Sequence, residues 1–160
     1  TTFAPNDYIT RAELTKMAVN GFNVPSVASL DNNEFVDITS ADWYTPYVLA
    51  AKEGGVIEGY EGGVFSPNGN VNRAEAMKIL IEAAGFTDVD NNFYTNFESK
   101  EGWWYAAFTD VPITEWFAKY IGYASTNGMV SGYDDGLFHP EWLITRAEAA
   151  KIISLILDLQ

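Results

Sequence analysis

Two stretches of the chain carry apolar residues at the period of a surface helix. In each, an aromatic residue is followed by apolar residues at i+4, i+7 and i+8, which places all of them on one face. These residues are Trp43, Tyr47, Ala50 and Ala51 in one stretch and Trp116, Tyr120, Tyr123 and Ala124 in the other. Gly55 and Gly128 follow, at positions where a glycine with positive φ commonly ends a helix. The spacing therefore predicts two equivalent amphipathic helices.

A second kind of helix is predicted three times, each time from the same N-terminal signal. An N-cap residue is followed three positions later by Glu, which is the capping box in which the two side chains satisfy each other's backbone N–H groups. The three pairs are Thr10 and Glu13, Asn72 and Glu75, and Thr145 and Glu148. Apolar residues such as Leu14 and Ala18 recur at core-facing positions behind each box. The fold class predicted is all-α, with helix-loop-helix repeats packed around a central, pseudo-threefold helical bundle.

The two kinds of helix belong to an internal repeat. Residues from Phe35 onward align without a gap with residues from Phe108 onward, and a partial third copy opens the chain. A helix pair of this size cannot bury its apolar face alone, so the repeats should share one core. We therefore predict four segments, which are 1–22 as the C-terminal half of a first repeat, 35–85 as a second repeat, 86–107 as an aromatic-rich linker insertion and 108–160 as a third repeat.

Composition and charge exclude several classes of partner. The 160 residues include 22 Asp or Glu and 9 Lys or Arg, for a formal net charge of −13. Nucleic acid is bound mainly through clustered Lys and Arg, so it is not an expected partner. No apolar run approaches the roughly 18 residues needed to span a bilayer, so membrane insertion is not expected either. Because 48% of the residues are hydrophobic, the chain should fold around a packed core.

The residues do not support an enzyme or a metal centre. The chain has no cysteine and a single histidine, His139. Disulfides, thiolate catalysis, a Ser-His-Asp triad and a histidine-rich metal site are therefore all excluded. We expect no catalytic residue, no metal and no cofactor.

Three arginines occupy one equivalent place in the repeats. Arg11, Arg73 and Arg146 each stand at the first position of a capped helix, where the helix dipole disfavours a cation. Beside free helical N–H groups, each guanidinium would form an anion-binding site. The alternative is an ion pair with an acid of the neighbouring repeat, such as Asp37 or Asp110, and the two interpretations can coexist. Lysines recur five residues beyond each arginine and are expected on a solvated helix flank: Lys16, Lys78 and Lys151.

The order of these motifs resembles the S-layer homology (SLH) domain of bacterial surface proteins. The resemblance rests on Phe-x-Asp before a Trp-led helix, on Gly-x-x-x-Gly-Tyr, on Gly-x-Phe-x-Pro, and on Ile-Thr-Arg-Ala-Glu at Ile9 to Glu13 and Ile144 to Glu148. It covers nearly the whole chain except the two linkers. The resemblance implies a pseudo-threefold spindle with grooves between neighbouring repeats. It further implies an extracellular module at the bacterial cell surface or cell wall, which anchors a protein non-covalently by binding secondary cell-wall polysaccharide linked to peptidoglycan, often through pyruvylated N-acetylmannosamine.

The resemblance also suggests which residues bind the glycan. The three arginines would bind the ketal carboxylate of the pyruvylated sugar. Tyr60 and Tyr133, with Gly59 and Gly132 before them, lie in predicted turns, where a tyrosine can stack on a sugar ring and donate its hydroxyl. The helical period assigns Trp43 and Trp116 to the core or to a groove wall.

The sequence departs from the family pattern at two places. The middle motif, Val71 to Glu75, has Asn72 in place of the N-cap Thr, a chemically competent substitute. The first repeat lacks its Phe-x-Asp and its Trp-led helix, so either residues upstream of Thr1 or another element must occupy that position. The incomplete first repeat and the high negative charge leave room for an alternative function, a protein-protein module for assembly of a surface layer that has lost glycan binding. Other surface-layer proteins are therefore possible partners.

Overall fold

The predicted helical fold is confirmed. The structure, a computed structural model, describes residues 3–27, 29, 33–86, 89, 98–100, 103–105 and 107–160. Within that part of the chain the helices are α1 (Arg11–Gly21), α2 (Thr45–Glu53), α3 (Arg73–Ala83), α4 (Ala118–Thr126) and α5 (Arg146–Leu157). One short antiparallel hairpin, β1 (Glu98–Lys100) and β2 (Trp103–Tyr105), is the exception to the helical fold among these residues.

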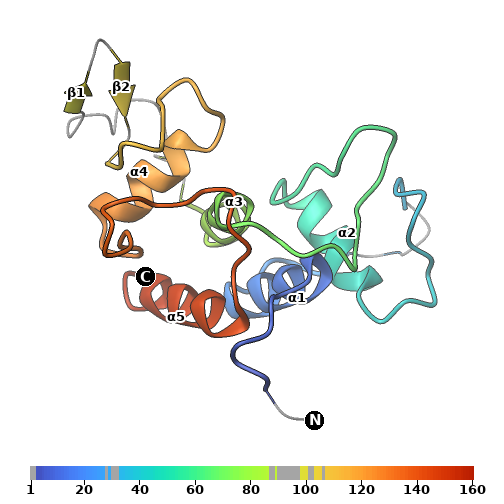
Figure 1. The fold of residues 1–160 in the computed structure, drawn as a ribbon. Coiled ribbons are helices and arrows are strands. Elements are labelled where there is room, and N and C mark those ends of the chain that lie inside the picture. The colour runs from blue at the N-terminus through green and yellow to red at the C-terminus, as the bar shows by residue number, and fades with distance from the viewer. Residues whose placement is uncertain are drawn as a thin grey trace.

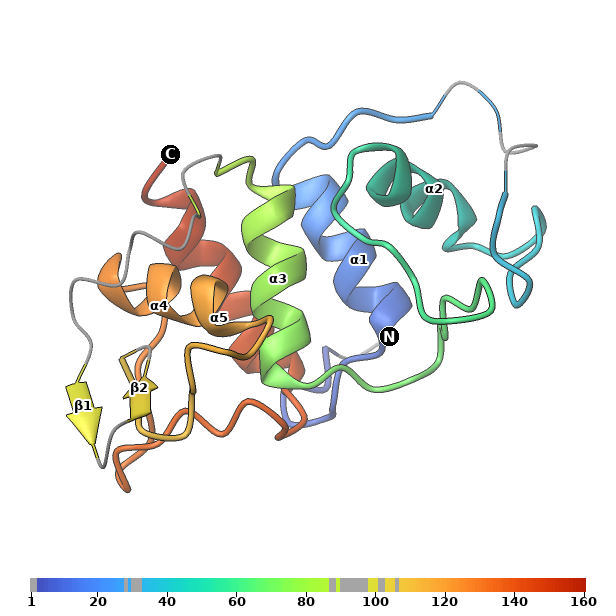
Figure 2. The same cartoon turned by 90° about the horizontal axis from the view of Figure 1, so that it is seen from above.

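The three capped helices lie in the middle of the molecule and the other two lie outside them. Helix α1 packs against both α3 and α5, while α2 packs on α1 and α4 packs on α3 (Figures 1 and 2). Each Trp-led helix therefore packs on the capped helix of the preceding repeat. Gly55 and Gly128 follow α2 and α4 with φ of +74° and +70°, as expected for glycines that end a helix.

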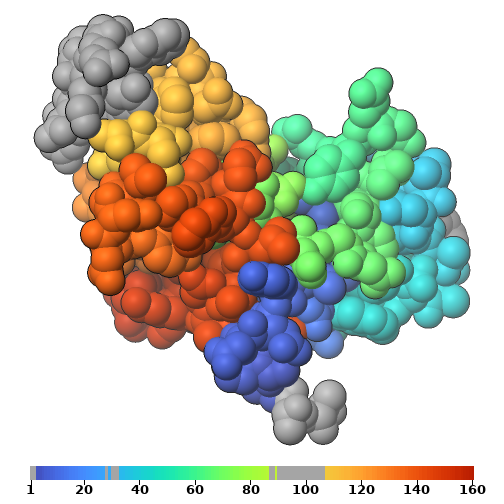
Figure 3. All heavy atoms as spheres, in the orientation of Figure 1, coloured from blue at the N-terminus to red at the C-terminus, as the bar shows by residue number. Residues whose placement is uncertain are grey.

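A closed cycle of backbone hydrogen bonds joins the three repeats just before the capped helices. Ile9 N donates to Ile144 O (3.1 Å), Ile144 N donates to Val71 O (3.0 Å), and Val71 N donates to Ile9 O (3.2 Å). All three side chains are buried. Figure 3 shows the three segments meeting on one face of the molecule, in blue, green and orange. The cycle gives this end of the bundle an approximate threefold symmetry.

The Phe-x-Asp motif fastens the long loop of each whole repeat. Phe35 packs on Phe65, and Phe108 packs on Phe138, each pair with ring centroids 5.5 Å apart. The aspartates two residues on accept the backbone N–H groups of the same loops. Asp37 accepts from Phe65 (2.8 Å) and Ser66 (2.6 Å), and Asp110 accepts from Phe138 (2.9 Å) and His139 (2.7 Å).

The predicted aromatic insertion is described only in part. The side chains of residues 87, 88, 90–106, including the aromatic ones, lie outside the described residues. Within its described backbone, Glu98 pairs with Tyr105 across the hairpin. No helix among the described residues is long and apolar enough to span a membrane.

Candidate functional site

Each arginine motif begins a helix through a complete capping box. The N3 amides of Glu13, Glu75 and Glu148 donate to the side chains of Thr10, Asn72 and Thr145, and each glutamate carboxylate accepts the N-cap amide in return. In the third motif the return bond from Thr145 N to Glu148 Oε2 measures 2.8 Å. The boxes place the three arginines at equivalent helical positions.

The backbone N–H groups beside the arginines are hydrogen-bonded, so the expectation of free helical N–H groups at these positions is wrong. Arg73 N donates to Trp142 O (2.8 Å), and Ala74 N donates to Pro140 O (3.0 Å). Arg11 and Arg146 donate in the same way to the carbonyls of Gly69 and Asp7. The acceptor always belongs to the loop of another repeat, which local sequence does not reveal. Any anion must therefore be bound by side chains.

The arginines form ion pairs between repeats, but not with the expected aspartates. Each one pairs with the capping-box glutamate of another motif rather than with Asp37 or Asp110, whose carboxylates bind loop amides instead. The Nη1···Oε1 distances are 3.6 Å for Arg11 and Glu75, 3.4 Å for Arg73 and Glu148, and 2.7 Å for Arg146 and Glu13. Each of the three glutamates therefore caps its own helix and also pairs with the arginine of another motif.

These contacts change the acidity of the glutamates. Burial by itself would raise the pKa of Glu148, but hydrogen bonds from Thr145 and Tyr133 and the charge of Arg73 lower it overall. Burial likewise opposes a lower pKa for Glu13, but hydrogen bonds from Thr10 and the charge of Arg146 outweigh it. Both carboxylates are therefore favoured in the ionised form that the ion pairs require.

Two of the three arginines are buried. Only 10% of the Arg11 side chain and 7% of the Arg73 side chain are exposed, against 21% for Arg146. Arg73 lies over the rings of Tyr133 (4.7 Å) and Phe138 (4.4 Å), and its Nε donates to Phe138 O (2.9 Å). The buried Nε of Arg11 has no hydrogen-bond partner among the described residues.

The two tyrosines of the turns lie on the arginines. The guanidinium of Arg11 is 4.6 Å from the Tyr60 ring, and the two hydroxyls donate to the motif glutamates, Tyr60 to Glu75 and Tyr133 to Glu148. Burial and the bond to Glu75 raise the pKa of Tyr60 to about 12. Burial raises the pKa of Tyr133 as well, and the bond to Glu148 adds to it against the opposing charge of Arg73. Both hydroxyls therefore keep their protons and act as donors near neutral pH.

Gly59 and Gly132 allow these turns to close. A Cβ on Gly59 would lie 2.5 Å from Cε1 of Phe35, and one on Gly132 would lie 2.7 Å from Cε1 of Phe108. Gly59 also has φ of +88°. Their backbone thus packs directly on the phenylalanine of Phe-x-Asp, which positions the tyrosine that follows.

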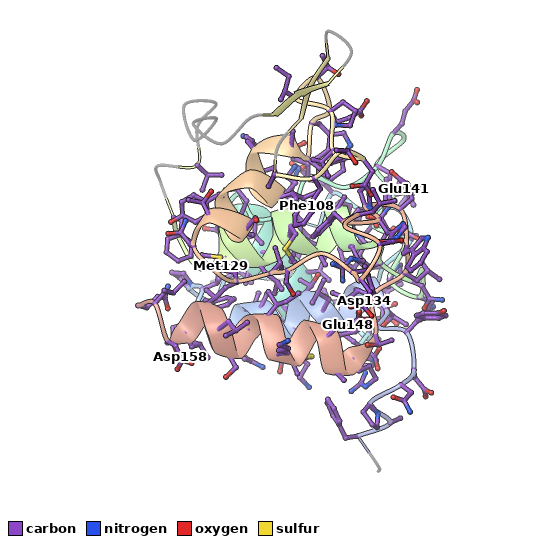
Figure 4. The ribbon with its side chains drawn as sticks, turned by 60° about the vertical axis from the view of Figure 1, so that its left-hand side comes forward. Phe108, Met129, Asp134, Glu141, Glu148 and Asp158 are labelled. Carbon is purple, nitrogen blue, oxygen red and sulfur yellow. The ribbon has the colours of Figure 1, made fainter. Side chains whose placement is uncertain are left out.

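The larger of two equivalent cavities lies beside Arg73. It has a volume of ≈ 370 Å³ and runs along α5 from Tyr133 and Glu148 to Leu155. Lys151, about one helical turn beyond Glu148, and Ser131 of the loop both line it. Figure 4 shows Glu148 on the first turn of α5, beside the loop that carries Asp134. Two cations and one carboxylate therefore line the Arg73 cavity.

The Arg11 cavity is smaller and electrically balanced. It has a volume of ≈ 150 Å³, and Trp116, just before α4, forms part of its wall. Glu58 stands where the Arg73 cavity has Ser131, and its carboxylate lies 3.4 Å from Lys78 Nζ. Two cations and two carboxylates thus line this cavity.

The surroundings of Arg146 lack some of the features found around Arg73 and Arg11. Its Nε donates to Phe3 O (2.8 Å), and no tyrosine corresponding to Tyr133 contacts it among the described residues. Lys16 lies 5.2 Å from the ring of Trp43, which is more than half exposed and so does not belong to the core.

Comparison with known proteins identifies the chain. The sequence pattern of the S-layer homology domain family matches residues 34–77 and 107–150. The chain belongs to the SLH family. The two matched stretches of this SLH chain include Gly59, Tyr60, Arg73, Gly132, Tyr133 and Arg146.

Several relatives are similar to this SLH chain over most of its length. Exoglucanase XynX of Acetivibrio thermocellus is 30% identical over 158 residues, which cover 99% of this chain and 14% of that protein. S-layer protein sap of Bacillus anthracis is 29% identical over 153 residues, covering 95% of this chain and 17% of that protein. The cellulosome-anchoring protein of A. thermocellus is 34% identical over 102 residues, covering 64% of this chain and 21% of that protein. The SLH chain therefore spans a small part of each, and it is associated with the cell surface or cell wall.

Sequence reasoning missed two residues of the SLH cavities. Lys78 and Lys151 were expected on a solvated flank, but they line the cavities beside the arginines. Their recurrence five residues beyond each arginine was the available signal. The sequence could not show that these lysines share a cavity with Glu58 in one repeat and with Ser131 in the other.

Proposed function

We propose that the chain anchors a larger protein non-covalently to the cell wall by binding a pyruvylated secondary cell-wall polysaccharide in the Arg73 cavity. The proposal assigns binding, and no catalysis, to this SLH chain. Arg73, Tyr133 and Gly132 form or position the binding site, and Lys151 adds a second cation. The smaller Arg11 cavity, with Tyr60 and Gly59, and the place around Arg146 are secondary candidates.

The observation that carries the proposal is the charge of the Arg73 cavity. In a chain of net charge −13, two cations face one carboxylate there, and the cavity has room for a ligand. A ketal carboxylate suits such a lining, because Lys151 offers three donors and the guanidinium of Arg73 has donors beyond those used by Phe138 and Glu148. Screening over about 8 Å at physiological salt limits the long-range repulsion from the rest of the chain.

Burial makes Arg73 a preorganised group. Its guanidinium is fixed by the Phe138 carbonyl and by the Tyr133 ring, so it loses little freedom when an anion arrives. The ion pair with Glu148 keeps the cation neutralised before binding. A ligand that neutralises Lys151 and shares Arg73 with Glu148 needs no rearrangement of the helix.

The test is calorimetric titration with a 4,6-pyruvylated N-acetylmannosamine glycoside and the same sugar without pyruvate. Lys151→Ala and Lys78→Ala form a matched pair, because the two lysines occupy equivalent positions in the two cavities. We expect binding that requires the pyruvate, weakened by Lys151→Ala and unchanged by Lys78→Ala. The reverse order would assign the site to the Arg11 cavity, and absence of binding to either sugar would favour an assembly module instead.

A further inference from the structure

An aromatic platform lies next to the Arg73 cavity. Trp142 stacks on His139 with ring centroids 3.7 Å apart and an angle of 5° between the rings. The ring of Tyr133, which lines the cavity, lies 5.3 Å from Trp142 and 5.4 Å from His139. The platform is therefore one ring removed from the cavity.

Hydrogen bonds fix both residues of the platform. His139 Nε2 lies 2.7 Å from Asp135 Oδ2, and its backbone N donates to Asp110. The carbonyl of Trp142 accepts the amide of Arg73, so the tryptophan backbone is tied to the first residue of α3. Yet Trp142 remains 52% exposed, with one face of its indole covered by His139. Such a large exposed indole, fixed in orientation, is typical of a binding surface rather than of a core.

The charges around the platform indicate what it can bind. Asp135 bonds to the His139 ring that stacks on Trp142, and Glu141 precedes Trp142 in the chain. Glu141 accepts a hydrogen bond from Asn72 Nδ2 (3.2 Å). Figure 4 shows Glu141 and Glu148 toward the N-terminal end of α5. Carboxylates are acceptors only, so they repel a second anion but accept hydrogen bonds from hydroxyl groups.

The platform belongs to this cavity alone among the equivalent loops. In the repeat alignment Ser66 and Ala4 stand in the place of His139, and Gly69 and Asp7 stand in the place of Trp142. All three loops share a turn here, because Ala4, Ser66 and His139 have positive φ and their carbonyls accept the amides of Asp7, Gly69 and Trp142. The stacked pair is therefore an addition of side chains on a shared turn.

We infer that Trp142, supported by His139, is a subsite that stacks on an uncharged sugar ring next to the anionic sugar in the Arg73 cavity. The inference rests on the proposed function, since the anionic sugar positions the chain of the glycan. The apolar face of the ring would lie on the indole, and its hydroxyls would donate to Asp135 or Glu141. The Arg73 cavity then binds two successive sugars of a wall polysaccharide.

The experiment compares two probes by calorimetry. One is the methyl glycoside of 4,6-pyruvylated N-acetylmannosamine, and the other is a disaccharide in which that sugar is linked to N-acetylglucosamine. The wild-type chain should bind the disaccharide about 2- to 10-fold more tightly than the monosaccharide. Trp142→Ala should remove this gain and leave the monosaccharide affinity unchanged, and His139→Ala should reduce the gain. Tyr8→Ala, which removes another exposed aromatic residue, should leave the gain intact.

The outcomes separate the two proposals. Two results would overturn the platform alone. In the first, the monosaccharide binds and the second sugar adds no affinity. In the second, the added affinity of the disaccharide survives in Trp142→Ala. Failure of both probes to bind overturns the platform together with the proposed function. Circular dichroism of each variant shows whether a lost gain reflects the platform or a lost fold, and Trp142→Phe, which keeps an aromatic face, should retain part of the gain.

Discussion

Arg73 Nη1 lies 3.4 Å from Glu148 Oε1, and the two residues occupy equivalent motifs in successive repeats. Glu148 at the same time caps its own helix through Thr145. The same relationship joins Arg11 to Glu75 and Arg146 to Glu13. Each capped motif therefore forms an ion pair with both of the other motifs, and the three pairs together join all three repeats.

Loss of Arg73 should cost stability as well as binding. Arg73→Ala removes the buried donor to the Phe138 carbonyl and the cation paired with Glu148, so we expect a loss of about 1–3 kcal/mol in the free energy of unfolding. Arg146→Ala removes a more exposed pair and should cost about 0–1 kcal/mol. Urea denaturation of both variants measures the difference, and equal losses would contradict the role of burial.

Gly59 should tolerate a side chain less well than Gly55. Both have positive φ, but a Cβ on Gly55 meets nothing within 4 Å, whereas one on Gly59 meets the Phe35 ring. Gly59→Ala combines backbone strain with overpacking, and the overpacking should add about 1–3 kcal/mol to the loss seen for Gly55→Ala. Thermal and urea unfolding check this, and similar losses in the two variants would mean that only φ matters.

Asn72, the N-cap residue of α3, should be replaceable by threonine, the N-cap residue of α1 and α5. Asn72→Ala removes the acceptor for Glu75 N and should cost about 0.5–2 kcal/mol. Asn72→Thr restores the cap found at Thr10 and Thr145 and should cost less, the bond from Asn72 to Glu141 being lost in both. Unfolding by urea ranks the three proteins, and a Thr variant as unstable as the Ala variant would show that the bond to Glu141 matters more than the cap.

Acid should destabilise the fold through the motif glutamates. The pKa values of Glu13 and Glu148 lie below the ordinary value of 4.5 in the folded chain, so both favour folding when ionised. Their contribution is present above pH 4.5 and is lost as the pH falls through the lowered values. Calorimetric melting between pH 6 and pH 3, at low protein concentration because the sequence pI is near 4.2, should show a falling Tm.

The control for this prediction is the double variant Glu13→Gln and Glu148→Gln. It removes the two titrations and should lose less stability on acidification than the wild-type chain does. An equal fall in both proteins would assign the acid sensitivity to other carboxylates.

Much of the fold followed from local patterns. The capping boxes of α1, α3 and α5 depend on residues three apart, and the helical stripes depend on residues within two turns, so both could be recognised without a structure. The match between Phe35 and Phe108 likewise indicated equivalent repeats. These features rest on short-range geometry that the order of residues specifies directly.

The candidate site depended on contacts between repeats. The order of residues indicated that Arg73 needed a partner, but not that Glu148 would supply it or that Trp142 O would occupy its amide. Nor could it show that Glu58 pairs with Lys78, whereas Lys151 lines a cavity in which Ser131 takes the place of that glutamate. These contacts form only when the three capped motifs meet in the folded chain. Folding brings together side chains that lie far apart in the sequence, which no local pattern records.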